Sequence, residues 1–285
     1  MKIGRIAVIA IAVIAAIMTV ASIISSDSSE KRYNEAVALY EEGKKEEAYD
    51  IFIDIKRYED SVSKASSIFA ETKLEKLKSA DIGSYIYFGK YEQDNDLENG
   101  PEPIKWLILD KVDIGSDRIL VISKEALDAV AYDDALLTEE LTWESSSIRN
   151  WLDKTFYPTA FDPVEQLFIS EVSLTDDNGE LYSENDKVFL LNTKEITKYL
   201  KTKEARTCRA TSYAKAMGVH EQRYRVLDGK EYYSCYWWLR STGETFRSAI
   251  CIYENGDFSN IGNSATDDFR GVRPAMWLDL SAVNN

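Results

Sequence analysis

The chain begins with one long apolar segment that is preceded by positive charge and followed by polar residues. Residues 6–24 carry no charge and approach the ~20 residues that a helix needs to cross a bilayer. Lys2 and Arg5 precede this segment, which predicts that the N-terminus faces the cytoplasm. Residues 1–26 are therefore predicted to be a signal anchor, a single transmembrane helix in the cell membrane with the rest of the chain outside the cytoplasm. A cleaved signal peptide is the alternative, and it implies the same location.

Residues 27–80 place apolar side chains three and four positions apart, which predicts a helical stalk. A first helix is expected over residues 33–40 and should end at Gly43, because glycine adopts left-handed backbone without strain. A second helix is expected over residues 48–55, and a third should begin near Asp60. The first two helices resemble a tetratricopeptide helical hairpin. Only one repeat is present, so a stalk is favoured over a peptide-binding groove.

Residues 81–285 change to short apolar segments separated by polar turns, which predicts one α+β globular domain. The Asn255–Gly256 pair is typical of a hairpin turn, after which residues 258–261 should run back as a strand. The other expected strands are residues 85–88, 104–109, 118–123, 187–191, 236–240, 248–253 and 271–278. The expected helices are residues 145–156, a segment after Phe161, residues 193–200 and residues 211–217.

Composition narrows the classes of protein that the chain can belong to. Aromatic residues make up 12% of the chain, a content typical of a packed fold and not of a disordered one. The net charge is −15. Because such a charge repels phosphate backbones, we expect no nucleic-acid partner.

Four sequence blocks carry a resemblance to a known family. They are YIYFGKYEQDND at residues 85–96, TWESSSIRNWL at 142–152, YWWLRST at 236–242 and GVRPAMWLDL at 271–280. Together they resemble an uncharacterised bacterial family, a domain of unknown function found on surface-directed proteins. That family in turn resembles the C-type-lectin fold, which formylglycine-generating enzymes and the variable proteins of diversity-generating retroelements share. The resemblance implies a C-type-lectin-like domain with flanking helices, in which the tail from Tyr236 to Leu280 forms the central sheet.

The same resemblance places a ligand surface in the C-terminal loops, which span residues 241–247 and 255–270. Polar loop residues that surround aromatic ones suit ligand binding. The candidate ligand-binding residues are Glu244, Asn255, Asp257, Asn260, Asn263, Asp267, Asp268 and Phe269. Solvated turns are an equally good interpretation of these loops.

Four further residues are expected to be structural because they lie in strands flanked by apolar residues. Trp237 and Trp238 are consecutive and point to opposite faces of a strand, so at least one of them should lie in the core. For Arg240 and Arg273, the family resemblance implies that they hold the domain together through bonds to backbone and carboxylate groups, and a ligand role is the alternative.

The sequence indicates no catalytic residue. The single histidine, His220, lies in a polar segment without a nucleophile motif. Cys208, Cys235 and Cys251 match neither a zinc-binding pattern nor a redox C-x-x-C, so small buried side chains are the favoured interpretation. Formylglycine-generating enzymes use two closely spaced cysteines, and Cys251 has no such neighbour. Paired carboxylates for glycoside cleavage stay open, because nothing singles out one pair.

No metal or cofactor is expected either. Residues 94–100 offer oxygen ligands for calcium, but their glycine lies at the wrong offset for an EF-hand loop. We therefore expect a membrane-anchored, extracytoplasmic recognition protein without catalytic activity, which binds a glycan or a protein through its C-terminal loops. The alternative is a structural or assembly subunit of a cell-envelope complex.

Overall fold

The computed structural model describes residues 28–112, 117–134 and 141–281. The chain divides into two compact units, Met1–Lys76 and Leu77–Asn285. In the first unit, residues 28–41 are helical and are followed by α2 (Lys45–Asp54) and α3 (Ser61–Phe69). A π-helical turn (Ala70–Leu74) leads to α4 (Glu75–Ser79). The three helices predicted within residues 27–80 are thus confirmed.

The core of the first unit comes from the apolar positions on which the helix prediction depended. Ala36, Ala48 and Phe52 are almost completely buried. The ring of Tyr33 meets that of Phe52 edge to face, with 5.5 Å between centroids. Gly43, with φ +82°, forms the turn after the first helix as predicted.

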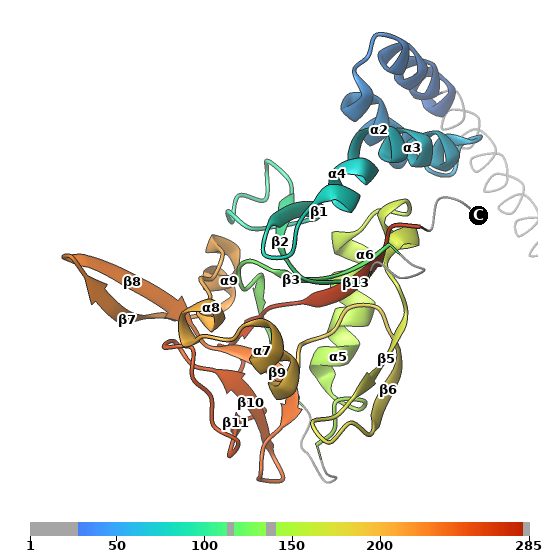
Figure 1. The fold of residues 1–285 in the computed structure, drawn as a ribbon. Coiled ribbons are helices and arrows are strands. Elements are labelled where there is room, and N and C mark those ends of the chain that lie inside the picture. The colour runs from blue at the N-terminus through green and yellow to red at the C-terminus, as the bar shows by residue number, and fades with distance from the viewer. Residues whose placement is uncertain (1–27, 113–116, 135–140, 282–285) are drawn as a thin grey trace, which may run out of the picture. The chain divides into compact units, whose positions relative to one another are not determined.

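The second unit contains a four-stranded antiparallel sheet of order β1-β2-β3-β13 (Figure 1). Its strands are β1 (Tyr85–Tyr91), β2 (Glu102–Val112), β3 (Arg118–Ser123) and β13 (Ala275–Asp279). Trp106 of β2 is fully buried, and its indole N–H donates to the Phe88 carbonyl at 2.7 Å. A buried tryptophan with a satisfied N–H adds a large apolar surface to this core.

A second sheet has five strands in the order β11-β10-β9-β12-β4. They are β4 (Asp128–Ala129), β9 (Trp237–Thr242), β10 (Ser248–Ile252), β11 (Asn263–Ser264) and β12 (Gly271–Val272). The β12–β9 pair is parallel and the other pairs are antiparallel. Every residue of β10 is buried, which explains why its sequence is almost continuously apolar.

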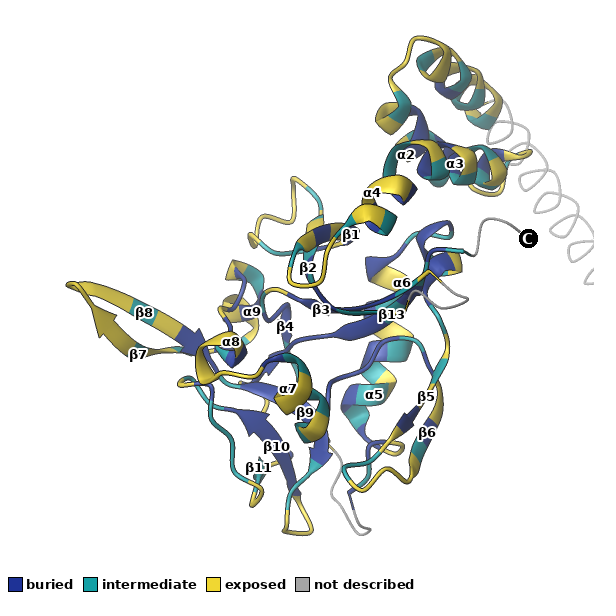
Figure 2. Cartoon of the chain, viewed as in Figure 1, coloured by how far each residue is buried: buried dark blue, intermediate teal, exposed yellow. Residues whose placement is uncertain are grey.

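Two further hairpins complete the strands, and they differ in how far they are buried. One pairs β5 (Val172–Thr175) with β6 (Leu181–Asp186), and the other pairs β7 (Glu221–Leu227) with β8 (Lys230–Cys235). The β7–β8 hairpin projects from the body of the unit as an arm (Figure 1). Figure 2 shows that this arm is mostly exposed, whereas the strands of the two larger sheets are mostly buried.

Short helices connect these strands, and their starts follow the capping residues of the sequence. They are α5 (Ser147–Trp151), a π-helical turn (Leu152–Phe156), α6 (Tyr157–Ala160), a 3-10 turn (Glu165–Phe168), α7 (Thr193–Tyr199), α8 (Lys203–Arg206) and α9 (Ser212–Met217). The side chains of Ser146, Asn192 and Thr211 each accept a bond from the backbone N–H three residues on. The predicted helices over residues 145–156, 193–200 and 211–217 are confirmed.

Two predicted strands are wrong. Residues 187–191 form only an isolated bridge, between Phe189 and Ala275. Residues 258–261 form no strand, and β10 pairs instead with β11. Residues 258–261 do not continue as a strand because the turn before them packs against α8, a contact between distant parts of the chain. A Cβ atom at Gly256 would lie 1.9 Å from the Lys203 carbonyl oxygen, and Asp257 forms an ion pair with the same lysine.

The expectation that the tail from Tyr236 to Leu280 forms one central sheet is also wrong. The predicted strand over residues 271–278 is broken, and its two halves join different sheets: β12 pairs with β9, and β13 pairs with β3. Proline explains the break, because Pro274 has no N–H to donate to a ladder. Its carbonyl instead accepts from the Ser123 N–H at 2.9 Å.

The predicted fold class therefore needs correction, and only its α+β part is retained. Among the residues that the structure describes, no helix is long and apolar enough to cross a membrane. The described helices are short, like the 10 residues of α2, and carry charged side chains that a bilayer core would not accept. The predicted transmembrane segment, residues 1–26, lies outside the described residues.

Candidate functional site

A small polar pocket lies where β9 ends beside the turn of the β5–β6 hairpin. Its volume is about 200 Å³. The lining residues carry carboxylate, amide, hydroxyl and guanidinium groups; they are Asp176, Asp177, Asn178, Tyr182, Asn192, Arg240, Ser241 and Thr242. Polar groups that converge on one concave space are the usual mark of a ligand site.

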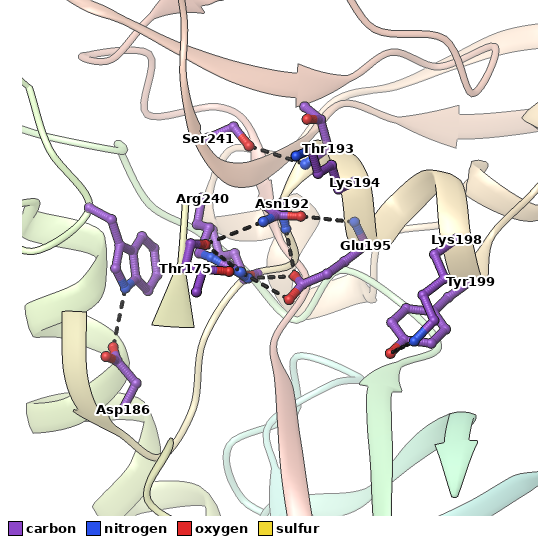
Figure 3. A network of polar contacts seen from close by, with 12 residues as sticks. Thr175, Asp186, Asn192, Thr193, Lys194, Glu195, Lys198, Tyr199, Arg240 and Ser241 are labelled. Atoms are coloured by element: carbon purple, nitrogen blue, oxygen red, sulfur yellow. Dashed lines mark hydrogen bonds and ion pairs between the residues drawn. The ribbon is translucent and has the colours of Figure 1, made fainter. Parts of the chain in front are cut away.

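Arg240 anchors the inner side of this pocket and is only 1% exposed. Its guanidinium donates to both carboxylate oxygens of Glu195, at 2.5 and 2.9 Å, and to the Thr175 carbonyl oxygen at 3.0 Å (Figure 3). It also donates to the Leu190 carbonyl oxygen at 2.8 Å. The two-pronged contact fixes the plane of the guanidinium and compensates its charge. The buried Nε atom of Arg240 has no hydrogen-bond partner.

The start of α7 positions Glu195 for this contact. Asn192 and Glu195 form a capping box: the Asn192 side chain accepts from the Glu195 N–H at 2.8 Å, and the Glu195 carboxylate accepts from the Asn192 N–H at 2.9 Å (Figure 3). The Asn192 amide also donates to the Thr175 carbonyl at 3.3 Å. Helix α7, strand β5 and strand β9 are thereby joined by one polar network.

The outer side of the pocket is the β5–β6 turn, which is held by its own backbone. One Asp176 carboxylate oxygen accepts from the N–H groups of Asn178 and Glu180, at 2.7 and 2.9 Å. Burial raises the pKa of Asp176, but these backbone bonds more than offset it, so the pKa lies below its ordinary value of 3.8. Asp176 is therefore ionised at neutral pH and accepts hydrogen bonds only.

Asp177 and Tyr182 supply further polar groups. One Asp177 carboxylate oxygen is shielded from solvent and has no hydrogen-bond partner. Burial raises the pKa of Tyr182, and the Thr242 side chain hydrogen-bonds to it. The pocket thus combines carboxylate acceptors with hydroxyl groups that both donate and accept.

The loop residues predicted to bind a ligand lie elsewhere, and several of them take part in internal contacts. Asn263 and Asp267 accept from the guanidinium of Arg270, at 3.1 and 2.7 Å. Arg270 is 6% exposed and lies over the ring of Trp238 at 5.1 Å from its centroid. Its guanidinium also lies 5.3 Å from the ring of Phe269, which is 43% exposed. We call Arg270 and these neighbours the Arg270 cluster.

The other predicted loop residues lie along the exposed turns. Asp257 forms an ion pair with Lys203, and the Asn255 side chain accepts from the Asp257 N–H at 2.9 Å. Glu244, Asn260 and Asp268 are exposed. The Glu244 N–H donates to the Asn260 carbonyl at 3.1 Å, which joins the two loops. The structure therefore gathers three of the eight residues around Arg270 and distributes the rest over the surface.

The four residues expected to be structural are all buried in the second unit. Trp237 and Trp238 are both fully buried, because each face of β9 is covered. Their indole N–H groups donate to the carbonyl oxygens of Arg206 and Val130, each at 3.0 Å. Arg273 is 3% exposed and donates to the Ser123 carbonyl at 2.7 Å.

One acidic cluster has the spacing of metal ligands. Carboxylate oxygens of Glu92, Asp94 and Glu102 lie within 4.8 Å of one another. They already accept bonds from the protein: Glu102 from the N–H of Gln93 at 2.7 Å, and Asp94 from the Asn99 amide at 2.9 Å. The loop over residues 94–100, considered above for calcium, thus has its oxygens engaged in local turns.

Of the pocket residues, only Arg240 was singled out from the sequence, and it was expected to be structural. Two signals for the others are present: residues 176–179 are polar and contain a glycine, as in a turn, and Asn-x-x-Glu at the start of α7 is a capping-box pattern. Neither signal shows that the loop and the helix start meet at the end of β9. Only contacts between distant segments, such as Arg240 with Thr175 and Glu195, bring them together.

The fold and the site define an α+β domain with a small polar pocket. The chain belongs to a family described as a domain of unknown function, DUF6273, whose model matches residues 116–280. This match confirms the resemblance to an uncharacterised family. No curated protein and no solved structure matches the chain, so the resemblance to the C-type-lectin fold has no support.

Proposed function

We propose that the second unit is a recognition domain that binds an uncharged carbohydrate group in the pocket beside the β5–β6 turn. The observation that carries the proposal is the chemistry of the lining: carboxylates, amides and hydroxyls around about 200 Å³. Drug-sized ligands occupy about 300–1,000 Å³. A space of this size therefore suits one sugar residue of a larger glycan.

Charge narrows the ligand class. Arg240 is the sole cation among the described lining residues, and Glu195 compensates it. Asp176 and Asp177 lie on the outer side, and the lining residues include no lysine or arginine other than Arg240, which is paired with Glu195. An anionic ligand is disfavoured by these carboxylates. Neighbouring sugar hydroxyls, by contrast, donate to carboxylates and accept from amide and hydroxyl donors.

Preorganisation favours the same interpretation. The Arg240–Glu195–Asn192 network fixes the inner side, and backbone bonds fix the Asp176 turn. A ligand therefore meets groups whose positions are already set, which lowers the entropy cost of binding.

A glycan array probed with the purified full-length chain tests the proposal. Asp177→Asn and Asn178→Ala change groups on the outer side of the pocket and should each weaken binding at least tenfold, about 1.4 kcal/mol. A triple variant of the exposed loops, Glu244→Gln, Asn260→Ala and Asp268→Asn, is the matched control and should bind normally. Loss of binding in the loop variant alone would move the site to the C-terminal loops. The proposal fails if the chain binds no glycan on the array.

A structural or assembly role is the second candidate, and the β7–β8 arm favours it. Val226 and Leu227 near the arm's tip are 56% and 44% exposed, and Tyr233 is 38% exposed. A two-stranded hairpin with little packing is at best marginally stable in water, and apolar residues on it suit a protein contact. Affinity capture with the full-length chain should then recover a stoichiometric partner, and Val226→Ser with Leu227→Ser should lose it.

A further inference from the structure

Two cysteines that are distant in sequence meet at the base of the β7–β8 arm. Cys208 follows α8, and Cys235 is the last residue of β8. The Cys235 N–H donates to the Cys208 carbonyl at 2.8 Å. The Ser234 hydroxyl accepts from the Cys208 N–H and donates to the Cys208 carbonyl, each at 2.9 Å. Three hydrogen bonds thus fix the two backbones side by side.

Both side chains are enclosed by the protein. The Cys208 thiol donates to the Arg209 carbonyl oxygen at 3.2 Å. Cys208 is 3% exposed and Cys235 is fully buried. Both thiols are free in this structure. Neighbouring backbones joined by backbone hydrogen bonds hold their Cα atoms about 4.5–5.5 Å apart, which lies within the separation of about 4.4–6.8 Å that a disulfide spans.

The surroundings favour the thiolate of one partner. Burial raises the pKa of Cys208, but the hydrogen bond from Cys235 and the nearby guanidinium of Arg273 more than offset it and lower that pKa. The hydrogen bond to Cys208 and burial raise the pKa of Cys235. One Arg273 nitrogen, Nη1, is buried without a hydrogen-bond partner. An asymmetric pair beside a cation is the arrangement in which one thiol attacks and the other completes the bond.

We propose that Cys208 and Cys235 form a structural disulfide when the chain folds in the presence of a small-molecule disulfide such as oxidised glutathione. The Cys208 thiolate attacks one glutathione sulfur and releases one reduced glutathione. The Cys235 thiolate then attacks the Cys208 sulfur of the mixed disulfide and releases the second. The two protein thiols lose two electrons and two protons in total, and one oxidised glutathione becomes two reduced molecules.

The bond would strengthen the connection between the arm and the body of the unit. Cys235 ends β8, so a covalent link to Cys208 ties this strand to the segment between α8 and α9. It would also restrict the unfolded chain between the two residues, which is how disulfides raise stability.

Cys251 provides a matched control inside the same chain. It is also buried, but its sulfur accepts from the Asn263 amide at 3.2 Å and from the Arg270 guanidinium at 3.4 Å. Burial raises its pKa to about 12. We expect Cys251 to stay a free thiol under the same conditions.

The test refolds the reduced full-length chain from urea in a mixture of reduced and oxidised glutathione, followed by mass spectrometry. Trypsin places the three cysteines on separate peptides, because Arg209, Arg240 and Arg247 divide them. The expected results are a mass decrease of about 2 Da, a linked pair of peptides that contain Cys208 and Cys235, and one thiol left for alkylation. Three alkylated thiols, or a link that involves Cys251, would overturn the proposal.

Variants and a stability measurement sharpen this test. Cys208→Ser and Cys235→Ser should each abolish the mass decrease, whereas Cys251→Ser should retain it. The peptide map of the unmodified chain decides the question even if one variant fails to fold. The oxidised chain should unfold at a higher urea concentration than the reduced chain, and a reductant should reverse the shift. A lower urea midpoint after oxidation would mean that the native structure does not accommodate the bond.

Discussion

Two regions of the second unit hold a buried arginine, and they use their polar residues in different ways. In the Arg270 cluster, Asn263 and Asp267 direct their polar atoms inward onto the guanidinium. At the pocket, Glu195 and two backbone carbonyls accept the hydrogen bonds that the Arg240 guanidinium donates. The carboxylates of the β5–β6 turn take no part in this and line the pocket, where Asp176 also accepts bonds from its own turn.

The difference teaches why polar loop residues are a weak guide to a binding site. An asparagine or aspartate in a loop has the same sequence signature whether it satisfies a buried cation or meets a ligand. A buried guanidinium needs several acceptors, and the chain supplies them from whichever segment lies nearest. The polar loop residues that can line a pocket are those that are not used to accept hydrogen bonds from a buried guanidinium.

Among the variants considered, replacement of Arg240 is expected to reduce stability most. Arg240→Met should lower the free energy of unfolding by about 3–5 kcal/mol, because it removes both bonds to the Glu195 carboxylate and the bonds to the Leu190 and Thr175 carbonyls. Urea unfolding measures the change. Arg240→Lys is the control and should recover part of the loss, because one ammonium cannot replace the two-pronged contact. A stability equal to that of the unmodified chain would show that the network is not structural.

A smaller loss is expected from the Arg270 cluster. Arg270→Met should lower the free energy of unfolding by about 2–3 kcal/mol, since the methionine keeps apolar contact with the rings while the bonds to Asp267 and Asn263 disappear. The same urea titration measures it, and Asp268→Asn is the exposed neighbouring control. If this loss exceeded that of Arg240→Met, the two regions would have to be ranked in the opposite order.

Removal of the helix cap at the pocket should have a moderate effect. Asn192→Ala removes the bond to the Glu195 N–H and should cost about 1–2 kcal/mol. The matched control is Thr202→Ala, because Thr202 caps the four-residue helix α8 at a more exposed place. Thermal unfolding of the two variants measures the difference between their losses of stability. An equal loss at both caps would mean that Asn192 acts only as a local cap and not as part of the pocket network.

The smallest effect concerns pH. The folded pKa of Asp176 lies below its ordinary value of 3.8, so its contribution is present above that value and is lost as the pH falls through the folded pKa. The unmodified chain should be slightly more stable than Asp176→Asn at pH 6. This difference should shrink between pH 4 and pH 2 in urea titrations. A difference that does not change with pH would show that the carboxylate charge does not support the turn.

The sequence predicted local elements well where apolar spacing and capping residues agree. The helices expected over residues 145–156, 193–200 and 211–217 begin next to the capping residues Ser146, Asn192 and Thr211. Residues 187–191 misled the prediction because a buried apolar segment resembles a strand even when it forms a single bridge. The prediction that the chain lies outside the cytoplasm stays a prediction.

By itself, the sequence determined which residues leave water and where helices start. These outcomes depend on side-chain polarity and on backbone chemistry within a few residues. Only the tertiary structure decided that β12 and β13 join different sheets, that Cys208 meets Cys235, and that the Asp176 turn faces the end of β9. Such contacts join segments tens of residues apart, and they depend on how the whole chain buries its apolar surface and satisfies its buried charges.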